Sequence, residues 1–222
     1  MSYLLGIIGL FVTLGLAFLI SSNKKAIKLK PLIVMFVLQL VLGFVLLRTT
    51  FGTAVVSVLA KMFDHLLAFA GQGVDFVFAG VANKGSAPFF LSVLMPIVFI
   101  SAIIGILRYI KILPLFMKAV GLGLSKINGM GKLESYNGVA SAILGQSEVF
   151  ISIKKELPFL SEKRLFTMSV SAMSTVSMSI VGSYMALIDS KYVITALVLN
   201  LFGGYILASI VNPYVLEEKE DE

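Results

Sequence analysis

The sequence of 222 residues contains no cysteine and only one histidine. The absence of cysteine excludes disulfides, thiol catalysis and cysteine-based metal sites, and it leaves the cellular compartment undecided. Neither H-E-x-x-H nor G-x-S-x-G is present, and one histidine offers little material for hydrolysis. We therefore expect neither an enzyme nor a protein that carries a metal or another cofactor.

Charged residues are scarce as well. They make up 14% of the chain against 58% hydrophobic residues, and the mean hydropathy is +0.99. A soluble domain of this size needs far more polar surface, so we expect an integral membrane protein. A helix crosses the bilayer with about 20 apolar residues. Five runs approach that length: 1–23, 31–47, 85–107, 165–188 and 192–216.

Positive charges predict the orientation of these helices. The first apolar run lacks the basic residues that precede the apolar core of a signal peptide, so it is expected to be a retained helix. It is followed in one short loop by Lys24, Lys25, Lys28 and Lys30. The positive-inside rule places this loop in the cytoplasm, the N-terminus outside and the acidic tail 217–222 in the cytoplasm. Such loops account for the net charge of +6, so nucleic-acid binding is not expected.

Three other segments deviate from a simple membrane span. Residues 51–80 mix charged with apolar positions, which favours a helix that lies in the membrane interface. Pro96 stands in the middle of an apolar run and predicts a kink there. Residues 113–132 are rich in glycine and lysine and predict a surface helix.

Residues 133–159, "LESYNGVASAILGQSEVFISIKKELPF", are too polar for a span that faces lipid. Four basic residues follow the middle of this stretch: Lys154, Lys155, Lys163 and Arg164. A single crossing would carry them outside, whereas a re-entrant hairpin from the cytoplasmic side keeps them inside. Gly145 supplies the turn without a Cβ penalty. Backbone of this kind at membrane depth must be buried in protein or line a wet cavity.

The expected tip of the hairpin carries Gln146, Ser147 and Glu148. A carboxylate inside the membrane costs about 2.5 kcal/mol or more, so Glu148 is expected to face a polar cavity. The alternative is an interfacial hairpin end, where Glu148 merely meets water among the headgroups. The amide of Gln146 suits the edge of a planar heterocycle. Ser147 is expected to cap the returning half-helix, and broken helices of this kind build solute sites in many secondary transporters.

The run 165–188 carries eight hydroxyl side chains. Such density predicts hydroxyl bonds to backbone carbonyls and a locally loosened helix, although small polar residues also serve ordinary helix packing in membranes. Glu134 and Asn137 are interpreted only as caps at the start of the hairpin. His65 beside Asp64 is interpreted as part of a solvated interfacial face, rather than as a proton relay.

The stretch "GKLESYNGVASAILGQSEVF...STVSMSIVGSY" resembles the concentrative nucleoside transporter family, and most of all its bacterial proton-coupled permeases. The similarity runs through the whole chain, and its specific signature is G-Q-[ST]-E, which begins at Gly145. The resemblance implies that this motif forms the tip of the first re-entrant hairpin and binds the nucleobase. Gln146 and Ser147 would hydrogen-bond the base, Glu148 would join them, and Ile180 would pack against it.

The resemblance also implies a cation site between the hairpin and the broken helix that follows. The aligned positions are Ser141, Leu144, Thr175 and Val176. Sodium-coupled members have an asparagine where this chain has Ser141. The change removes an amide oxygen ligand, which favours a proton over sodium as the coupling ion, with Glu148 as the natural proton carrier.

Members of the family have a second half, with another hairpin that holds the ribose, whereas this sequence ends at Glu222. The resemblance therefore predicts a truncated or split gene product of the bacterial inner membrane, or a fragment whose partner is separately encoded, and in either case a chain that is inactive alone. It also implies a homotrimer.

The expected organisation is scaffold-like helices in 1–112, half of a transport domain in 113–216 with the hairpin at about 133–159, and the tail. The function hypothesis is a proton-coupled nucleoside symporter; a non-transporting scaffold or assembly subunit and a transporter of another polar solute stay open.

Overall fold

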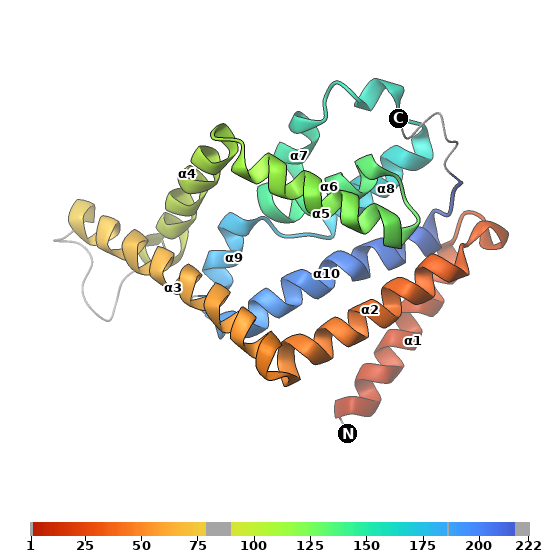
Figure 1. Cartoon of the computed structure of the whole chain (residues 1–222), viewed down its shortest axis with the longest axis horizontal. Coiled ribbons are helices and arrows are strands. Elements are labelled where there is room, and N and C mark those ends of the chain that lie inside the picture. The colour runs from red at the N-terminus through yellow and green to blue at the C-terminus, as the bar shows by residue number, and fades with distance from the viewer. Residues whose placement is uncertain (1, 79–89, 186, 216–222) are drawn as a thin grey trace.

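A computed structural model of the chain describes residues 2–78, 90–185 and 187–215 (Figure 1). Every regular element within these ranges is helical, which confirms the all-α class. Within the described residues four helical segments are long and apolar enough to cross a membrane, one of them the interrupted segment Glu162–Met185, and a fifth crossing results if one bent pair of helices forms a single span. This agrees with the expectation of about five. The expected tail 217–222 lies outside the described residues, and the division at residue 112 stays a prediction.

The first three helices are α1 (Ser2–Ile20), α2 (Leu29–Arg48) and α3 (Thr50–Phe78). A tight corner joins α2 to α3, where the Thr49 hydroxyl donates to Val45 O at 2.7 Å and accepts from Gly52 N at 3.0 Å. A Cβ atom at Gly52 would overlap the Val45 carbonyl. Only glycine therefore lets the two helices approach so closely at this corner.

Helix α3 confirms that the described part of the less hydrophobic segment, residues 51–78, is helical. At 29 residues it is about 43 Å long, and it is one of the four helical segments that satisfy the length and composition of a span. One face, which includes Val56, Ala60 and Phe63, is buried, and α3 packs against α2, α4 and α10. Its expected position in the membrane interface stays a prediction.

The kink predicted at Pro96 stays a prediction. A π-helical turn (Phe90–Leu94) leads into α4 (Met95–Tyr109), and Pro96 lies in the first turn of α4. The sharp change of direction comes later, where α4 and α5 (Ile112–Asn128) meet at 80°. Lys111 makes this bend with φ of 63°, a left-handed conformation that is unusual for lysine.

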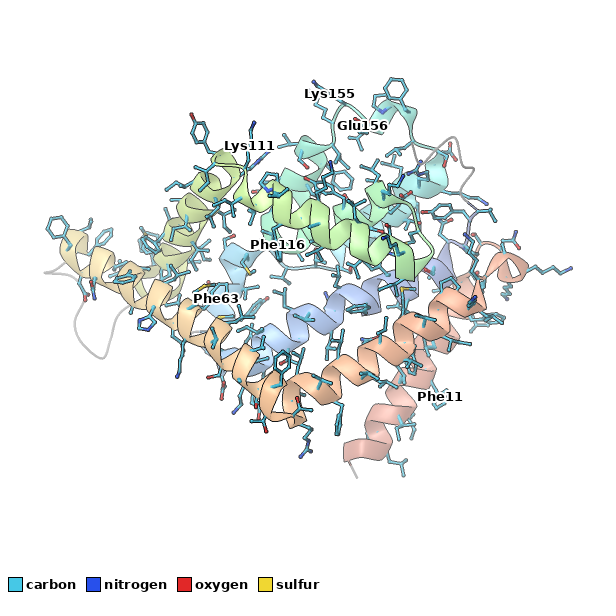
Figure 2. All side chains as sticks on the ribbon, viewed as in Figure 1. Phe11, Phe63, Lys111, Phe116, Lys155 and Glu156 are labelled. Carbon is cyan, nitrogen blue, oxygen red and sulfur yellow. The ribbon has the colours of Figure 1, made fainter. Side chains whose placement is uncertain are left out.

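Helix α5 has one side packed against α6 (Lys132–Leu144) and another open to the surroundings. Met117 is buried, whereas Phe116, labelled in Figure 2, is 56% exposed. The close approach occurs at Gly121, where an added Cβ would lie 2.9 Å from Tyr136 Cα. The predicted surface helix is therefore half-embedded in the protein.

The remaining helices are α7 (Gln146–Ser152), α8 (Glu162–Met173), α9 (Met178–Met185) and α10 (Ser190–Val211). In Figure 1 α10 runs between α2 and the α5–α6 pair, and it contacts α2, α3, α6 and α8. It approaches α6 closely at Gly138, where a Cβ would overlap the Tyr205 hydroxyl. That hydroxyl donates to Ser135 O at 2.8 Å.

Apolar residues fill two clusters and also cover much of the outside. Met35, Met117, Ala140 and Tyr205 belong to the larger cluster between α2, α5, α6 and α10. Phe63 belongs to the smaller one between α3, α9 and α10. Dozens of large apolar side chains are nevertheless exposed. So much apolar surface is incompatible with water and fits a lipid environment.

Candidate functional site

The turn at the hairpin tip depends on Gly145, which separates α6 from α7. Its φ of 105° and ψ of 165° lie in a region that side-chain-bearing residues rarely adopt. An added Cβ would lie 2.9 Å from Glu148 Oε2 and 3.1 Å from Ser177 Cβ. Both the backbone conformation and the lack of space therefore require glycine at this position.

After the tip the chain runs back, so that the start of α8 lies beside the start of α6. Arg164, in the first turn of α8, contacts Glu134 in the first turn of α6. The break between α8 and α9 then comes close to the tip, because Ser177 lies beside Gly145. The segment therefore enters and leaves at one end, as predicted for a hairpin.

Gln146, Ser147 and Glu148 form the exposed first turn of α7, and the buried Val149 anchors this short helix. The Glu148 carboxylate folds back beside Gly145. The predicted cap by Ser147 is wrong. Gly145 is the N-cap residue and no side chain caps the helix, because the helix already begins at Gln146. All three polar side chains are available to a solute.

The hydroxyl-rich run is interrupted at residues 174–177, between α8 and α9. The hydroxyls of Ser174 and Thr175 donate to Ser171 O at 2.9 Å and Ala172 O at 3.0 Å. These bonds confirm the predicted back-bonding to carbonyls in a loosened helix. From α10, Asn200 Nδ2 donates to Ser174 O at 2.6 Å, which gives a freed carbonyl a partner. The break between α8 and α9 is therefore stabilised by side-chain hydrogen bonds to its backbone carbonyls.

The other predicted site residues lie in the α8–α9 break, on α9 and in the last turn of α6. Thr175 and Val176 lie in the break itself, and Ile180 is 42% exposed on α9. Ser141 and Leu144 are buried in the last turn of α6. The Ser141 hydroxyl donates to Gly138 O at 2.9 Å, so its hydrogen is already engaged.

Ser177 was not predicted as a site residue, although it lies beside the tip. Its hydroxyl is 3.1 Å from that of Ser179 and is part-buried. Ser177 belongs to the break between α8 and α9, and this break lies against Gly145. The sequence alone does not indicate this contact. The eight hydroxyls in one run were the available signal, but they do not reveal which of them meets the tip.

A buried polar seam between α6 and α8 was missed. Glu134 is fully buried, and Arg164 donates to it through Nε at 2.5 Å and Nη2 at 3.0 Å. The Tyr214 hydroxyl donates to the same carboxylate at 3.0 Å. Glu134 is therefore not a cap, since Gly131 occupies that position. Asn137 is not a cap either: its Nδ2 donates to Met168 O at 2.9 Å.

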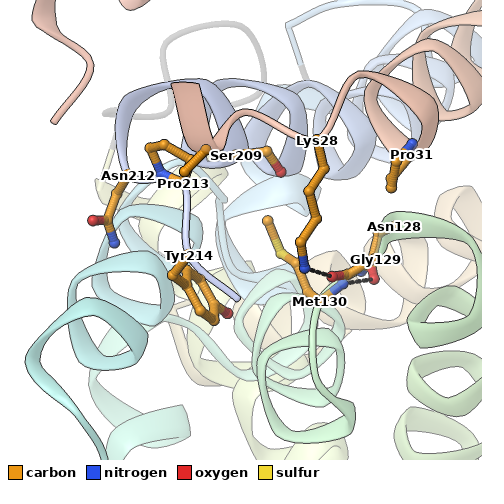
Figure 3. A pocket seen from close by; sticks show the side chains of 10 residues that line it. Lys28, Pro31, Asn128, Gly129, Met130, Ser209, Asn212, Pro213 and Tyr214 are labelled. Atoms are coloured by element: carbon orange, nitrogen blue, oxygen red, sulfur yellow. Dashed lines mark hydrogen bonds between the residues drawn. The ribbon is translucent and has the colours of Figure 1, made fainter. Parts of the chain in front are cut away.

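Figure 3 shows the end of the molecule next to this seam, where the α1–α2 loop, the end of α5 and the segment after α10 meet. Lys28 Nζ donates to Gly129 O at 3.5 Å, and Met130 N donates to Asn128 Oδ1 at 2.9 Å. A lysine near the last carbonyls of α5 is favoured by the helix dipole. Tyr214 lines the same hollow, so the segment after α10 ties the hairpin base to the first two helices.

Two protein-family models match the chain. One describes the N-terminus of a Na⁺-dependent nucleoside transporter and matches residues 8–81. The other describes nucleoside recognition and matches residues 90–191. These matches, together with the helical membrane fold and its two helix breaks, relate the chain to a class of membrane transporters.

The chain is similar along its whole length to known transporters. It is 37% identical to the purine nucleoside transport protein NupG of Bacillus subtilis, covering 100% of this chain and 56% of that protein. It is 29% identical to the nucleoside permease NupC of Helicobacter pylori, covering 96% and 53%. A structure of CNTnw in an inward-facing substrate-bound state superposes with a TM-score of 0.90 at 27% identity, covering 98% and 55%. The chain belongs to the concentrative nucleoside transporter family, and it spans about half the length of these relatives.

Proposed function

We propose that this chain provides the nucleobase-binding half of a proton-coupled nucleoside symporter. The observation that carries the proposal is the meeting of two helix breaks, at Gly145 and at Ser177, beside an exposed amide, hydroxyl and carboxylate. Gln146 offers a donor and an acceptor to the edge of a base, and Ser147 offers both through one hydroxyl. Ile180 supplies an apolar surface for the face of the base.

The proton is the proposed coupling ion, with Glu148 as its carrier. Glu148 is the carboxylate at the meeting point of the breaks. At the aligned cation position, Ser141 offers a hydroxyl already bonded to Gly138 O instead of an amide oxygen. Proton and nucleoside would each bind better in the presence of the other, because coupling between two binding sites is reciprocal. Leu144, Thr175 and Val176 would surround the coupling position without supplying a carboxylate.

The rest of the transporter is part of the same proposal. The ribose contacts come from a polypeptide that corresponds to the part of the relatives which this chain does not cover. The assembly is a homotrimer in the bacterial inner membrane, with the Lys24–Ala26 turn on the cytoplasmic side. Support for these points comes from the family resemblance and from the positive-inside pattern.

Binding of adenosine and uridine to the purified chain tests the base site. The substitution Gln146→Ala is expected to weaken binding about tenfold, since it removes hydrogen bonds together worth about 1.4 kcal/mol. The control Gln72→Ala removes the same side chain from an exposed position of α3 and is expected to leave binding unchanged. Binding that survives both Gln146→Ala and Glu148→Ala would contradict the proposal and favour a scaffold subunit or a different solute site.

Proteoliposomes test the coupling. The chain is reconstituted alone or with the uncovered part of the Bacillus subtilis relative, and nucleoside uptake is followed under a proton or a sodium gradient. We expect uptake only from the combined halves and only with the proton gradient. Uptake driven by sodium, or pH-driven uptake by the chain alone, would refute the corresponding part.

A further inference from the structure

A hollow far from the hairpin tip opens where the α2–α3 corner meets the start of α10. Its volume is about 670 Å³. Leu46, Val56 and Ala60 supply apolar lining, whereas Arg48, Lys61 and Tyr192 supply polar and aromatic groups. The hollow thus offers an apolar floor and a charged rim to one ligand.

The charges on the rim do not balance. Lys191 Nζ lies 3.0 Å from Asp189 Oδ2, and the hydrogen bond from Lys191 lowers the pKa of the Asp189 carboxyl, which keeps this pair ionised. Asp64 accepts a hydrogen bond from the Ser190 hydroxyl at 2.9 Å. Arg48 and Lys61 have no ion-pair partner among the described residues. Three cations (Arg48, Lys61 and Lys191) and two carboxylates (Asp64 and Asp189) therefore line the hollow, which leaves a net charge of +1 for an anion.

The hollow meets a second, more apolar groove at Tyr192, which lines both. This groove, of about 440 Å³, follows α9 and α10 along Val181, Val193 and Leu197. Its direction is into the span of α10, away from the end that carries Arg48. A ligand held at the rim can therefore extend an apolar chain along the protein surface.

We propose that this hollow and groove bind one anionic phospholipid. Its phosphate contacts Arg48 and Lys61, and an acyl chain follows the groove between α9 and α10. Arg48 is the last residue of α2, and the end of a membrane span lies at the level of the headgroups. A soluble anion would leave the apolar floor unused. A neutral nucleoside would leave the net positive charge of the rim without a counter-charge.

Native mass spectrometry of the detergent-purified chain measures the binding. Phosphatidylglycerol and phosphatidylcholine with identical acyl chains are titrated against the natural chain and against the double variant Arg48→Gln/Lys61→Gln. Each basic residue near an anionic headgroup contributes a factor of about five, so the double variant should bind phosphatidylglycerol about 25-fold more weakly. The control Lys154→Gln/Lys155→Gln removes two exposed charges from the hairpin segment and should leave the affinity unchanged.

A second variant tests the groove without changing any charge. Ala196 lines it, and Ala196→Trp should lower the affinity for phosphatidylglycerol while circular dichroism and gel filtration stay unchanged. If the double charge variant does not fold, the two single variants should each show the fivefold loss. Equal affinity for both lipids, unchanged affinity in the charge variants, or displacement of the lipid by inorganic phosphate or adenosine would each overturn the proposal.

Discussion

The substitution Arg164→Met would leave the fully buried carboxylate of Glu134 without its guanidinium partner. The side chains of this pair are 4% and 0% exposed, so water cannot replace the lost contact. Breaking a buried ion pair by removing one partner costs about 3–5 kcal/mol, because the other charge stays buried and uncompensated. The bond from Tyr214 to the carboxylate recovers only a part of this energy. We expect the free energy of unfolding to fall by about 3 kcal/mol or more.

The measurement is reversible unfolding in mixed micelles, followed by circular dichroism. Lys163→Met is the matched control, because the neighbouring residue is exposed and its loss should change stability by less than about 0.5 kcal/mol. The double variant Glu134→Leu/Arg164→Met removes both charges and should be more stable than Arg164→Met alone. The reasoning is refuted if Arg164→Met resembles the control, or if the double variant loses the sum of the two single losses.

The other predictions concern the two helix breaks. Gly145→Ala should weaken nucleoside binding and cost at least about 1 kcal/mol of stability, because φ is 105° and the Cβ has no space; Gly123→Ala, on an open face of α5, should be neutral or stabilising in the same unfolding assay. Asn200→Leu should cost about 1 kcal/mol, since a carbonyl in the α8–α9 break loses its donor; an unchanged midpoint would contradict this. Glu148→Gln should abolish uptake driven by a pH gradient in the combined-half proteoliposomes, whereas the exposed Glu156→Gln should retain it.

The hairpin and the loosened helix could be predicted because each follows from local chemistry. Gly145 stands in the middle of a segment too polar to face lipid, and the basic residues on both sides fix the end at which the chain enters and leaves. Serine and threonine hydroxyls can donate to backbone carbonyls three residues earlier, and there they compete with the backbone N–H groups of the helix. This competition is local and does not depend on where the fold places the helix. The cap by Ser147 failed for a local reason too, because α7 starts at Gln146, two residues before the position at which a helix capped by Ser147 would start.

The partners across the seam could not be predicted in the same way. Arg164 follows a polar loop, and the positive-inside rule counts it as a cytoplasmic charge, whereas the structure buries it beside Glu134. Nothing local distinguishes it from Lys163, which is exposed. The difference arises only when α6 and α8 lie together, with residues 30 positions apart in contact.

The spacing of polar residues nevertheless carries that information once the two helices are compared. Helix α6 has Glu134 and Asn137 three residues apart, and α8 has Arg164 and Thr167 at the same interval; each series continues four residues later with a serine. Residues at i, i+3 and i+7 share one face of a helix. Two such faces inside an apolar chain satisfy their polar groups by packing against each other. The polar contacts of the seam therefore fix the position of α8 against α6. This position places the break after α8 beside the hairpin tip.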